Sequence, residues 1–560
     1  MRVAVSVALV RNRTAAQNGE TVSQPPLVPT PARLLLADGG PFVLTRHGEV
    51  VAGADAENAA DELRRKVAVR TGIHLPAALS ADAAQPGATG HIRLDLGHDG
   101  PAESYRVRVD AASVRITGAD AAGLYYGVQT LVQAITARDR RWVVPAMEID
   151  DAPRFAYRGV MLDVARHFHG VDTVRGYIER AASLKFNVLH LHLTDDQGWR
   201  VQLDSHPALA EKGSATAVGG DPGGFYTRDD YRAIVAHAAA HHMTVVPEVD
   251  VPSHTHAVSL AYPDLCERPV ITDAVEAGSV HAGLPIPGEA YCGIAVGFSS
   301  LKIHDERTYS FLADVFGELA ELTPGPYLHL GGDEPLGIDP ADYDTFIGRV
   351  SALVAATGKT PIAWHEAGAS ATLAPATVGQ YWGFVSPTDG ADDKARAFVD
   401  RGGRVILSPA DAIYLDMKFA PDSPLGLTWA RGVTTAQRSY EWDAADVIDG
   451  LTDPDILGVE APLWGETGRS ADDIDALAFP RIAAAAEAAW SPPFGTSALR
   501  TWESFRTRVG GLGPLWERLG IRFTALPEIA WLADAHAGDG AASSDESDAD
   551  EIDAADSERP

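Results

Sequence analysis

The chain has 560 residues, with 46 Lys and Arg against 77 Asp and Glu, and its formal net charge is −31. Apolar residues make up 46% of the sequence, which is enough for a large buried core and excludes a chain that is disordered throughout. The acidic balance argues against nucleic acid and anionic membrane surfaces as partners, because both would repel the protein, and no apolar run is long enough to span a bilayer.

The N-terminal residues carry a mixed targeting signal. A run of small apolar residues in Met1–Val10 is interrupted by Arg11 and Arg13, and no small-residue cleavage site follows it. This pattern favours a cytoplasmic location and leaves secretion open. We expect residues 1–24 to form a flexible segment.

Residues 25–150 are expected to form a small non-catalytic α+β domain. A Pro-rich stretch leads into it, and β-branched runs at 105–109 and 113–117 indicate strands. A helix is predicted over 121–135, with Asp120 as its N-cap.

Residues 151–500 alternate between apolar strand-like runs and helical patterns. The strand candidates are 159–164, 187–193, 244–249, 326–330, 360–364, 377–382, 404–407 and 456–464. The main helix candidates are 171–184, 228–241, 306–322, 341–356 and 475–489. Eight such strands predict a (β/α)8 barrel, that is, an α/β TIM-barrel catalytic domain. An open doubly wound sheet is the alternative, but no G-x-G-x-x-G follows the first strand.

The C-terminal part divides into two segments. Residues 501–536 carry amphipathic stretches with Trp502, Trp516 and Trp531, and we expect a helical segment packed on the barrel. Residues 537–560 are acidic and have almost nothing to bury, which predicts a disordered tail. Cys266 and Cys292 are too few for a Cys-based zinc site and could form one bridge if the protein is exported.

Polar residues gather at the ends of the predicted barrel strands, where the active site of such a barrel lies. Acids, an arginine, histidines and several tryptophans together exceed what helix capping requires. Aromatic faces stack on sugar rings while carboxylates and Arg bind hydroxyls, so this composition favours a carbohydrate ligand. The residues are Asp163, Arg166, His192, Asp195, Asp196, Glu248, Asp250, His254, His329, Asp333, Glu334, Trp364, Glu366, Trp382, Tyr414, Asp416, Trp464 and Glu466.

The sharpest local motif is HLGGDEP, residues 329–335. Its two glycines allow a tight turn and a close approach of a ligand. Adjacent Asp333 and Glu334 repel each other, so one of them tends to keep its proton near neutral pH and can act as a general acid. A strand-to-helix turn capped by Asp is the purely structural alternative.

Six segments in order resemble glycoside hydrolase family 20, whose members are β-N-acetylhexosaminidases. They are RGVMLDVARHF (158–168), NVLHLHLTDDQGWR (187–200), VVPEVDVPSHTHA (245–257), HLGGDE (329–334), QYWG (380–383) and LWGET (463–467). The segment ADAAGLYYGVQTLVQ (119–133) is similar to the end of that family's non-catalytic domain. The resemblance covers residues 25–500 and implies an exo-acting, retaining enzyme without a cofactor.

By this resemblance, Glu334 is the general acid/base, Asp333 holds the N–H of the substrate's 2-acetamido group, and Tyr414 donates to its carbonyl oxygen. The acetamido oxygen itself would attack the anomeric carbon, which is substrate-assisted catalysis through an oxazolinium intermediate. The expected substrate is an oligosaccharide or small molecule ending in β-linked N-acetylglucosamine or N-acetylgalactosamine. The choice between these two sugars, and the oligomeric state, stay open.

The resemblance also implies a set of supporting residues. Trp364, Trp382 and Trp464 match the apolar cage around the acetamido methyl group. Asp250 and His254 match a pair behind the acid/base, and Asp196 could share the role of Asp195. The remaining substrate-binding matches are Arg166, Asp195, Glu466, Asp416 and, near the leaving group, Trp429.

The sequence departs from the family pattern at two places, and three alternative functions are considered beside the one that the resemblance implies. Pro252-Ser253 and Pro335 differ from the family pattern, which puts fine positioning in doubt but removes no functional group. A catalytically silent sugar-binding protein and an enzyme that releases disaccharides or transfers the sugar are two alternatives. Leaving-group contacts would then lie on variable loops such as 264–300. The third is a metal-dependent hydrolase, for which the candidate ligands are His190, His192, Asp250, His254 and His256. The matched family needs no metal, and none is expected.

Overall fold

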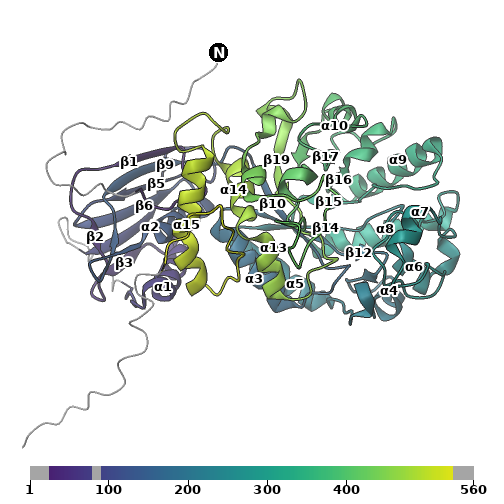
Figure 1. The fold of residues 1–560 in the computed structure, drawn as a ribbon. Helices are drawn as coiled ribbons and strands as arrows, with labels where there is room; N and C mark the ends of the chain where they lie inside the picture. Colours follow the sequence, from purple (N-terminus) through teal and green to yellow (C-terminus); the bar gives the residue numbers. More distant parts are fainter. Residues whose placement is uncertain (1–23, 78–89, 534–560) are drawn as a thin grey trace, which may run out of the picture.

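The computed structural model describes residues 24–77 and 90–533. The predicted tail at 537–560 and nearly all of the predicted N-terminal segment lie outside these residues. Within the described ranges, no helix combines the length and the apolar character that a membrane span requires. A mixed α/β unit lies beside a barrel, and helix α15 lies along the junction between them (Figure 1).

The N-terminal unit is built on a six-stranded sheet in the order β1-β9-β5-β6-β4-β3. Helices α1 (Glu57–Thr71) and α2 (Ala121–Ala134) pack together, and α2 packs on the sheet. Asp120 caps α2 as predicted, because its Oδ1 accepts the N–H of Gly123 at 2.8 Å. The strands are β1 (Arg33–Leu36), β3 (Glu49–Ala52), β4 (His91–Leu96), β5 (Tyr105–Val109), β6 (Ser113–Gly118) and β9 (Met147–Asp151), and a smaller sheet holds β2 (Phe42–Val43), β7 (Thr136–Arg138) and β8 (Arg141–Val144).

Eight parallel strands close into a barrel, which confirms the predicted fold class. All eight predicted strands are present within a few residues of their predicted bounds. They are β10 (Tyr157–Asp163), β11 (Val188–His192), β14 (Thr244–Glu248), β15 (Tyr327–His329), β16 (Thr360–Trp364), β17 (Val378–Tyr381), β18 (Val405–Leu407) and β19 (Ile456–Ala461).

Strand register brings polar residues to one level at the carboxyl end of the barrel. Asp163 pairs with His192, His192 pairs with Glu248, and Glu248 pairs with His329 across four neighbouring strands. Because parallel strands end at the same edge, residues 29 to 81 positions apart in sequence become neighbours there.

The barrel helices follow the predictions with one exception. The confirmed helices are α3 (Val171–Ser183), α5 (Arg228–Ala240), α8 (Glu306–Leu322) and α9 (Pro340–Ala356), and α10 (Ala391–Asp400) also covers the barrel. The single helix predicted over 475–489 is wrong. It is broken into α13 (Ala471–Ala478) and α14 (Arg481–Trp490), because Pro480 has no N–H to continue the first helix.

Shorter elements decorate the loops at the barrel's carboxyl end. Segment 264–300 contains one short α-helix. Cys266 and Cys292 are both free thiols and are not joined in a disulfide. The short elements are β12 (Thr194–Asp195), β13 (Gly198–Trp199), α4 (Pro207–Gly213), α6 (His256–Ala261), α7 (Asp273–Gly278), α11 (Ala410–Ile413) and α12 (Ala436–Tyr440).

Helix α15 (Trp502–Arg518) joins the barrel to the N-terminal unit. Arg508 donates to the carbonyl of Leu27 at 2.6 Å and forms an ion pair with Glu487 of α14. Glu487 is fully buried and also pairs with Arg500 at 2.8 Å. The expected packing on the barrel is therefore only part of the contact, since the helix bridges both units.

Candidate active site

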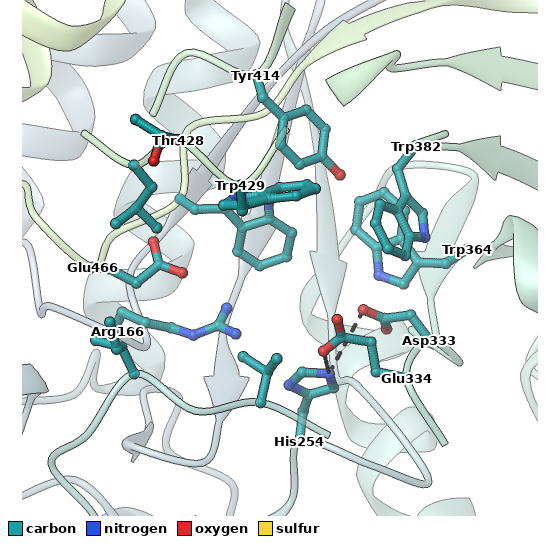
Figure 2. A pocket seen from close by; sticks show the side chains of 14 residues that line it. Arg166, His254, Asp333, Glu334, Trp364, Trp382, Tyr414, Thr428, Trp429 and Glu466 are labelled. Atoms are coloured by element: carbon teal, nitrogen blue, oxygen red, sulfur yellow. Dashed lines mark ion pairs between the residues drawn. The ribbon is translucent and has the colours of Figure 1, made fainter. Parts of the chain in front are cut away.

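A cavity of about 540 Å³ opens at the carboxyl ends of the barrel strands (Figure 2). Of the thirteen predicted site residues, ten line it and come from loops spread over the whole barrel sequence. The lining residues are Arg166, His254, Ile294, Val296, Asp333, Glu334, Trp364, Trp382, Tyr414, Leu427, Thr428, Trp429, Trp464 and Glu466.

The turn that follows β15 presents Asp333 and Glu334 to the cavity. Gly331 and Gly332 adopt positive φ angles of 71° and 103°, which glycine accepts without strain. A Cβ on Gly331 would collide with the carboxylate of Asp250, whose Oδ1 accepts the N–H of Gly332 at 3.0 Å. The glycines of the motif thus permit both the turn and a close approach of Asp250.

His254 lies beneath both acids. Its Nε2 is 3.6 Å from Asp333 Oδ2 and 3.5 Å from Glu334 Oε2, and its Nδ1 is 3.2 Å from Asp195 Oδ1 (Figure 2). Burial lowers the pKa of His254, but Asp195, Asp250 and Asp333 outweigh burial and raise it well above its usual value. The carboxylates therefore favour the cationic form of the ring, which lies between them.

The two adjacent acids have different surroundings. The Asp333 side chain is 11% exposed and that of Glu334 is 32% exposed. Burial raises the pKa of Asp333 to about 6, His254 opposes the rise, and Glu334 adds to it. Burial and the neighbouring Asp333 also raise the pKa of Asp250 well above its usual value.

Three tryptophans and Tyr414 form an apolar wall. The rings of Trp364 and Trp464 are 6.0 Å apart, and those of Tyr414 and Trp464 are 6.3 Å apart. The indole N–H of Trp364 donates to Glu248 at 2.9 Å, which fixes the ring at the barrel floor. The Tyr414 hydroxyl points into the cavity (Figure 2), and burial raises its pKa well above its usual value, so it stays a hydrogen-bond donor.

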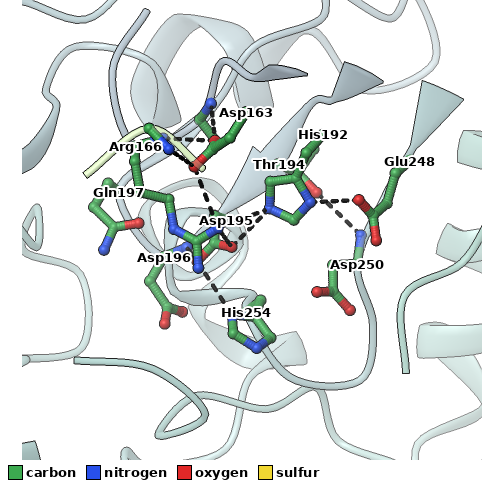
Figure 3. A network of polar contacts seen from close by, with 12 residues as sticks. Asp163, Arg166, His192, Thr194, Asp195, Asp196, Gln197, Glu248, Asp250 and His254 are labelled. Carbon is green, nitrogen blue, oxygen red and sulfur yellow. Dashed lines mark hydrogen bonds and ion pairs between the residues drawn. The ribbon is translucent and has the colours of Figure 1, made fainter. Parts of the chain in front are cut away.

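Arg166 and Glu466 stand on the opposite side from Asp333 and Glu334 (Figure 2). Arg166 Nη1 lies 2.8 Å from Asp195 Oδ2 and 3.4 Å from Asp163 Oδ2 (Figure 3). Burial raises the pKa of Glu466 to about 7, with Arg166 opposing the rise. This side of the cavity offers a guanidinium group and a carboxyl group, and both can form hydrogen bonds with the hydroxyl groups of a sugar.

Three predicted residues lie behind the cavity wall. Asp195 Oδ2 contacts Arg166 and His192, and its Oδ1 contacts His254. Asp250 accepts the N–H of Gly332 and so stabilises that turn. Asp416 Oδ1 accepts the N–H of Trp464 at 3.5 Å, and its other oxygen has no hydrogen-bond partner among the described residues. Asp196 accepts the N–H of His256 at 2.9 Å and does not line the cavity.

The sequence motifs did not single out five residues of this site. Ile294 and Val296 come from segment 264–300, and Leu427 and Thr428 precede Trp429. None of these lies in a recognisable motif, so only the loop itself could be anticipated. The fifth, Glu366, lies two residues beyond the end of β16, and the sequence patterns gave it no specific role. Its Oε2 accepts the Trp382 indole N–H at 3.0 Å, and burial, followed by Asp333, raises its pKa to about 8.

Two of the histidines proposed as metal ligands, His190 and His192, lie against acids at the barrel floor, as does His329. His190 Nε2 and His329 Nδ1 lie 3.1 Å and 3.0 Å from the oxygens of Glu248, and His190 Nδ1 lies 2.9 Å from Glu460. His190, Glu248 and His329 are close enough together to hold a cation, as are Asp250, His254 and Asp333. His256 is apart from both groups, with its Nε2 on the carbonyl of Glu289 at 2.8 Å.

Comparisons with known proteins bear directly on this geometry. The model of the glycosyl hydrolase family 20 catalytic domain matches residues 155–337 and 340–493, and that of the family's domain 2 matches residues 24–152. A β-N-acetylhexosaminidase of Cellulomonas fimi is 39% identical over 518 residues, which cover 90% of this chain and 97% of that protein.

Solved structures agree in fold over nearly the same span. A family 20 β-N-acetylglucosaminidase superposes with a TM-score of 0.84 at 58% identity, covering 91% of this chain and all of the other. The Streptomyces plicatus N-acetyl-β-hexosaminidase, solved in complex with thio-NAglucal, superposes with a TM-score of 0.81 at 41% identity over 90% of this chain and 98% of its own.

Proposed function

The chain belongs to glycosyl hydrolase family 20, and on this basis we propose that it is an exo-acting, retaining β-N-acetylhexosaminidase. The substrate would end in β-linked N-acetylglucosamine or N-acetylgalactosamine. The observation that carries this assignment is that Asp333, Glu334, Tyr414 and the tryptophan wall line one cavity.

In the first step, the acetamido carbonyl oxygen of the substrate attacks the anomeric carbon while the bond to the glycosidic oxygen breaks. Glu334 donates its proton to that oxygen, so the leaving group departs as a neutral alcohol. The product is an oxazolinium ring that carries the positive charge. No carboxylate of the enzyme bonds to the sugar, which separates this chemistry from the two-carboxylate scheme.

Asp333 and Tyr414 act on the acetamido group. The Asp333 carboxylate accepts its N–H and stabilises the positive charge as it develops, an effect that is strong because the side chain is largely buried. The Tyr414 hydroxyl donates to the carbonyl oxygen and orients it for attack. Trp364, Trp382 and Trp464 surround the methyl group, which keeps water away from the reacting oxygen.

In the second step, water attacks the anomeric carbon from the face that the leaving group has left. Glu334, now a carboxylate, accepts a proton from this water, and the oxazolinium ring opens to restore the acetamide. Two displacements at one carbon give net retention. Arg166 and Glu466 bind the sugar's hydroxyls at the far side of the cavity, which favours a terminal sugar.

The test is hydrolysis of a chromogenic β-N-acetylglucosaminide by wild type, Asp333→Asn and Glu334→Gln. Each variant should lose ~10²-fold or more in kcat, the scale of general-acid and electrostatic contributions. Glu267→Gln, a change at an exposed carboxylate, is the control. A thiazoline that mimics the oxazolinium ring should inhibit competitively.

Two outcomes would contradict the proposal. Activity that survives in Glu334→Gln would place the acid on another residue. A folded wild type that binds N-acetylglucosamine but hydrolyses no such glycoside at any pH or salt concentration would favour a sugar-binding protein.

A further inference from the structure

A second cavity, of about 350 Å³, adjoins the first one. The two share Ile294, Val296 and Glu334. The other lining residues of the second cavity are Ala274, Val275, Gly278, Ala295 and Leu336. The general acid therefore lines both cavities and stands at their shared boundary.

The loop between the two cavities, which carries Ile294, Val296 and Gly297, contacts the turn that carries Glu334. Gly297 has a φ of 72°, and a Cβ there would lie 2.8 Å from the backbone oxygen of Glu334 and 3.0 Å from Leu336 Cγ. Glu334 itself has a positive φ of 46°. The position of Ile294 and Val296 relative to the acid is thus fixed by backbone contact.

The lining of the second cavity is aliphatic apart from Glu334. Ile294 is 44% exposed and Leu336 is 39% exposed, although both side chains are apolar. Seven of the twelve exposed large apolar side chains among the described residues fall between positions 270 and 336: Val270, Ile271, Val280, Leu284, Ile286, Ile294 and Leu336. Two of them, Ile294 and Leu336, line the second cavity, and exposed apolar surface beside a catalytic pocket is typical of a binding site.

The reaction chemistry indicates which cavity binds the terminal sugar and which binds the leaving group. Glu334 must contact the glycosidic oxygen, so the terminal sugar lies on one side of it and the leaving group on the other. The first cavity holds Arg166, Glu466, Tyr414 and the tryptophans, which suit the sugar. The second cavity lies beyond the acid on the side of Ile294, whereas Trp429, which the resemblance places near the leaving group, lines the first cavity.

We propose that this second cavity binds the leaving group and that the leaving group it fits is an apolar alcohol, such as an alkyl aglycone. The inference rests on the proposed function and narrows it. A sugar in this position would leave its hydroxyls against aliphatic side chains without hydrogen-bond partners, which is costly. A sugar leaving group would instead stack on Trp429, the half-exposed ring at the rim of the first cavity.

The test compares the methyl and n-butyl β-glycosides of N-acetylglucosamine. Their alcohols are similar in leaving ability, so the ratio of kcat/KM reports contacts to the alkyl chain. Each buried methylene is worth about a fourfold gain in binding, and three of them should raise kcat/KM by ~10-fold or more. Leu336→Asn and Ala274→Asp, at exposed positions of the second cavity, should each lower the butyl-to-methyl ratio at least ~3-fold.

Val280→Asn is the matched control, because Val280 is 71% exposed in the same segment and lines neither cavity. Its ratio should equal that of wild type. A wild-type ratio within twofold of one, or a ratio that Leu336→Asn and Ala274→Asp leave unchanged, would overturn the inference while leaving the proposed function intact. Hydrolysis of neither glycoside, nor of the chromogenic substrate, would instead count against the proposed function itself.

Discussion

Asp195 Oδ2 lies 2.8 Å from Arg166 Nη1, and both side chains are at most 3% exposed. Burial alone would raise the pKa of Asp195, but Arg166 and then His254 outweigh burial and hold it below its usual value. Asp195 therefore remains ionised and fixes the guanidinium that faces the cavity. We interpret it as a positioning residue for Arg166.

Asp195→Asn should lower kcat/KM by ~30-fold or more, mainly through KM, because a buried cation loses its charged partner at a cost of roughly 2–5 kcal/mol. Steady-state kinetics measure this. Asp229→Asn, which removes an exposed ion pair with Arg232, should change kcat/KM by less than twofold. Equal losses in both variants would show that Asp195 does not orient Arg166.

The activity should depend on pH through Asp333. Its pKa of about 6 means that the carboxyl takes up a proton as the pH falls below that value. A protonated Asp333 cannot stabilise the positive charge of the oxazolinium ring, so kcat/KM should fall about tenfold per pH unit on the acid side.

The pH profile of Asp333→Asn tests this assignment. Its kcat/KM should be lower throughout and should lack the acid limb near pH 6, because the titrating group is gone. Recovery of activity after return to neutral pH separates titration from unfolding. An acid limb that persists unchanged in the variant would assign it to another group.

Glu366 should destabilise the protein increasingly as the pH rises. Burial raises its pKa from 4.5 to about 8 in the folded state. Between these values the unfolded chain releases the proton and the folded chain keeps it, so folding becomes less favourable with rising pH and the cost is complete above about pH 8.

Glu366→Gln removes this cost and keeps an acceptor for the Trp382 N–H. We expect its free energy of unfolding to exceed that of wild type by on the order of 1–4 kcal/mol at pH 8 and by much less at pH 5. Urea denaturation at the two pH values measures both differences. A gain of the same size at pH 5 and pH 8 would be incompatible with titration of Glu366.

Glu487 should anchor α15 to the barrel. Burial alone would raise its pKa, but Arg508 and Arg500 outweigh burial and lower it, so the group is a buried carboxylate between two cations. It also accepts the backbone N–H of Thr30 at 3.0 Å, which ties in the N-terminal unit.

Glu487→Gln should cost ~3–5 kcal/mol of stability, because two buried arginines lose their shared counter-charge. The free energy of unfolding in urea is the measurement, and Glu517→Gln at an exposed position of α15 is the control. A loss below ~1 kcal/mol would mean that Arg508 and Arg500 find compensation elsewhere.

The sequence by itself determined the barrel and the chemistry at its centre. Each strand of a parallel barrel is buried on both faces and reads as a short apolar run, and a polar turn follows it, so the periodicity located all eight strands. The motif at 329–335 indicated the acids for the same local reason, since its glycines and adjacent carboxylates are contiguous.

Other features depend on residues that are far apart in sequence, and only the tertiary structure decided them. The raised pKa of Asp333 requires burial that outweighs the opposing charge of His254, and the raised pKa of Glu366 requires burial and Asp333. The second cavity arises because Gly297 lets its loop pack on the turn of Glu334, and no local pattern encodes that contact. Local patterns specify elements and their polar ends, whereas the distances between those ends follow from closure of the barrel and from loop packing.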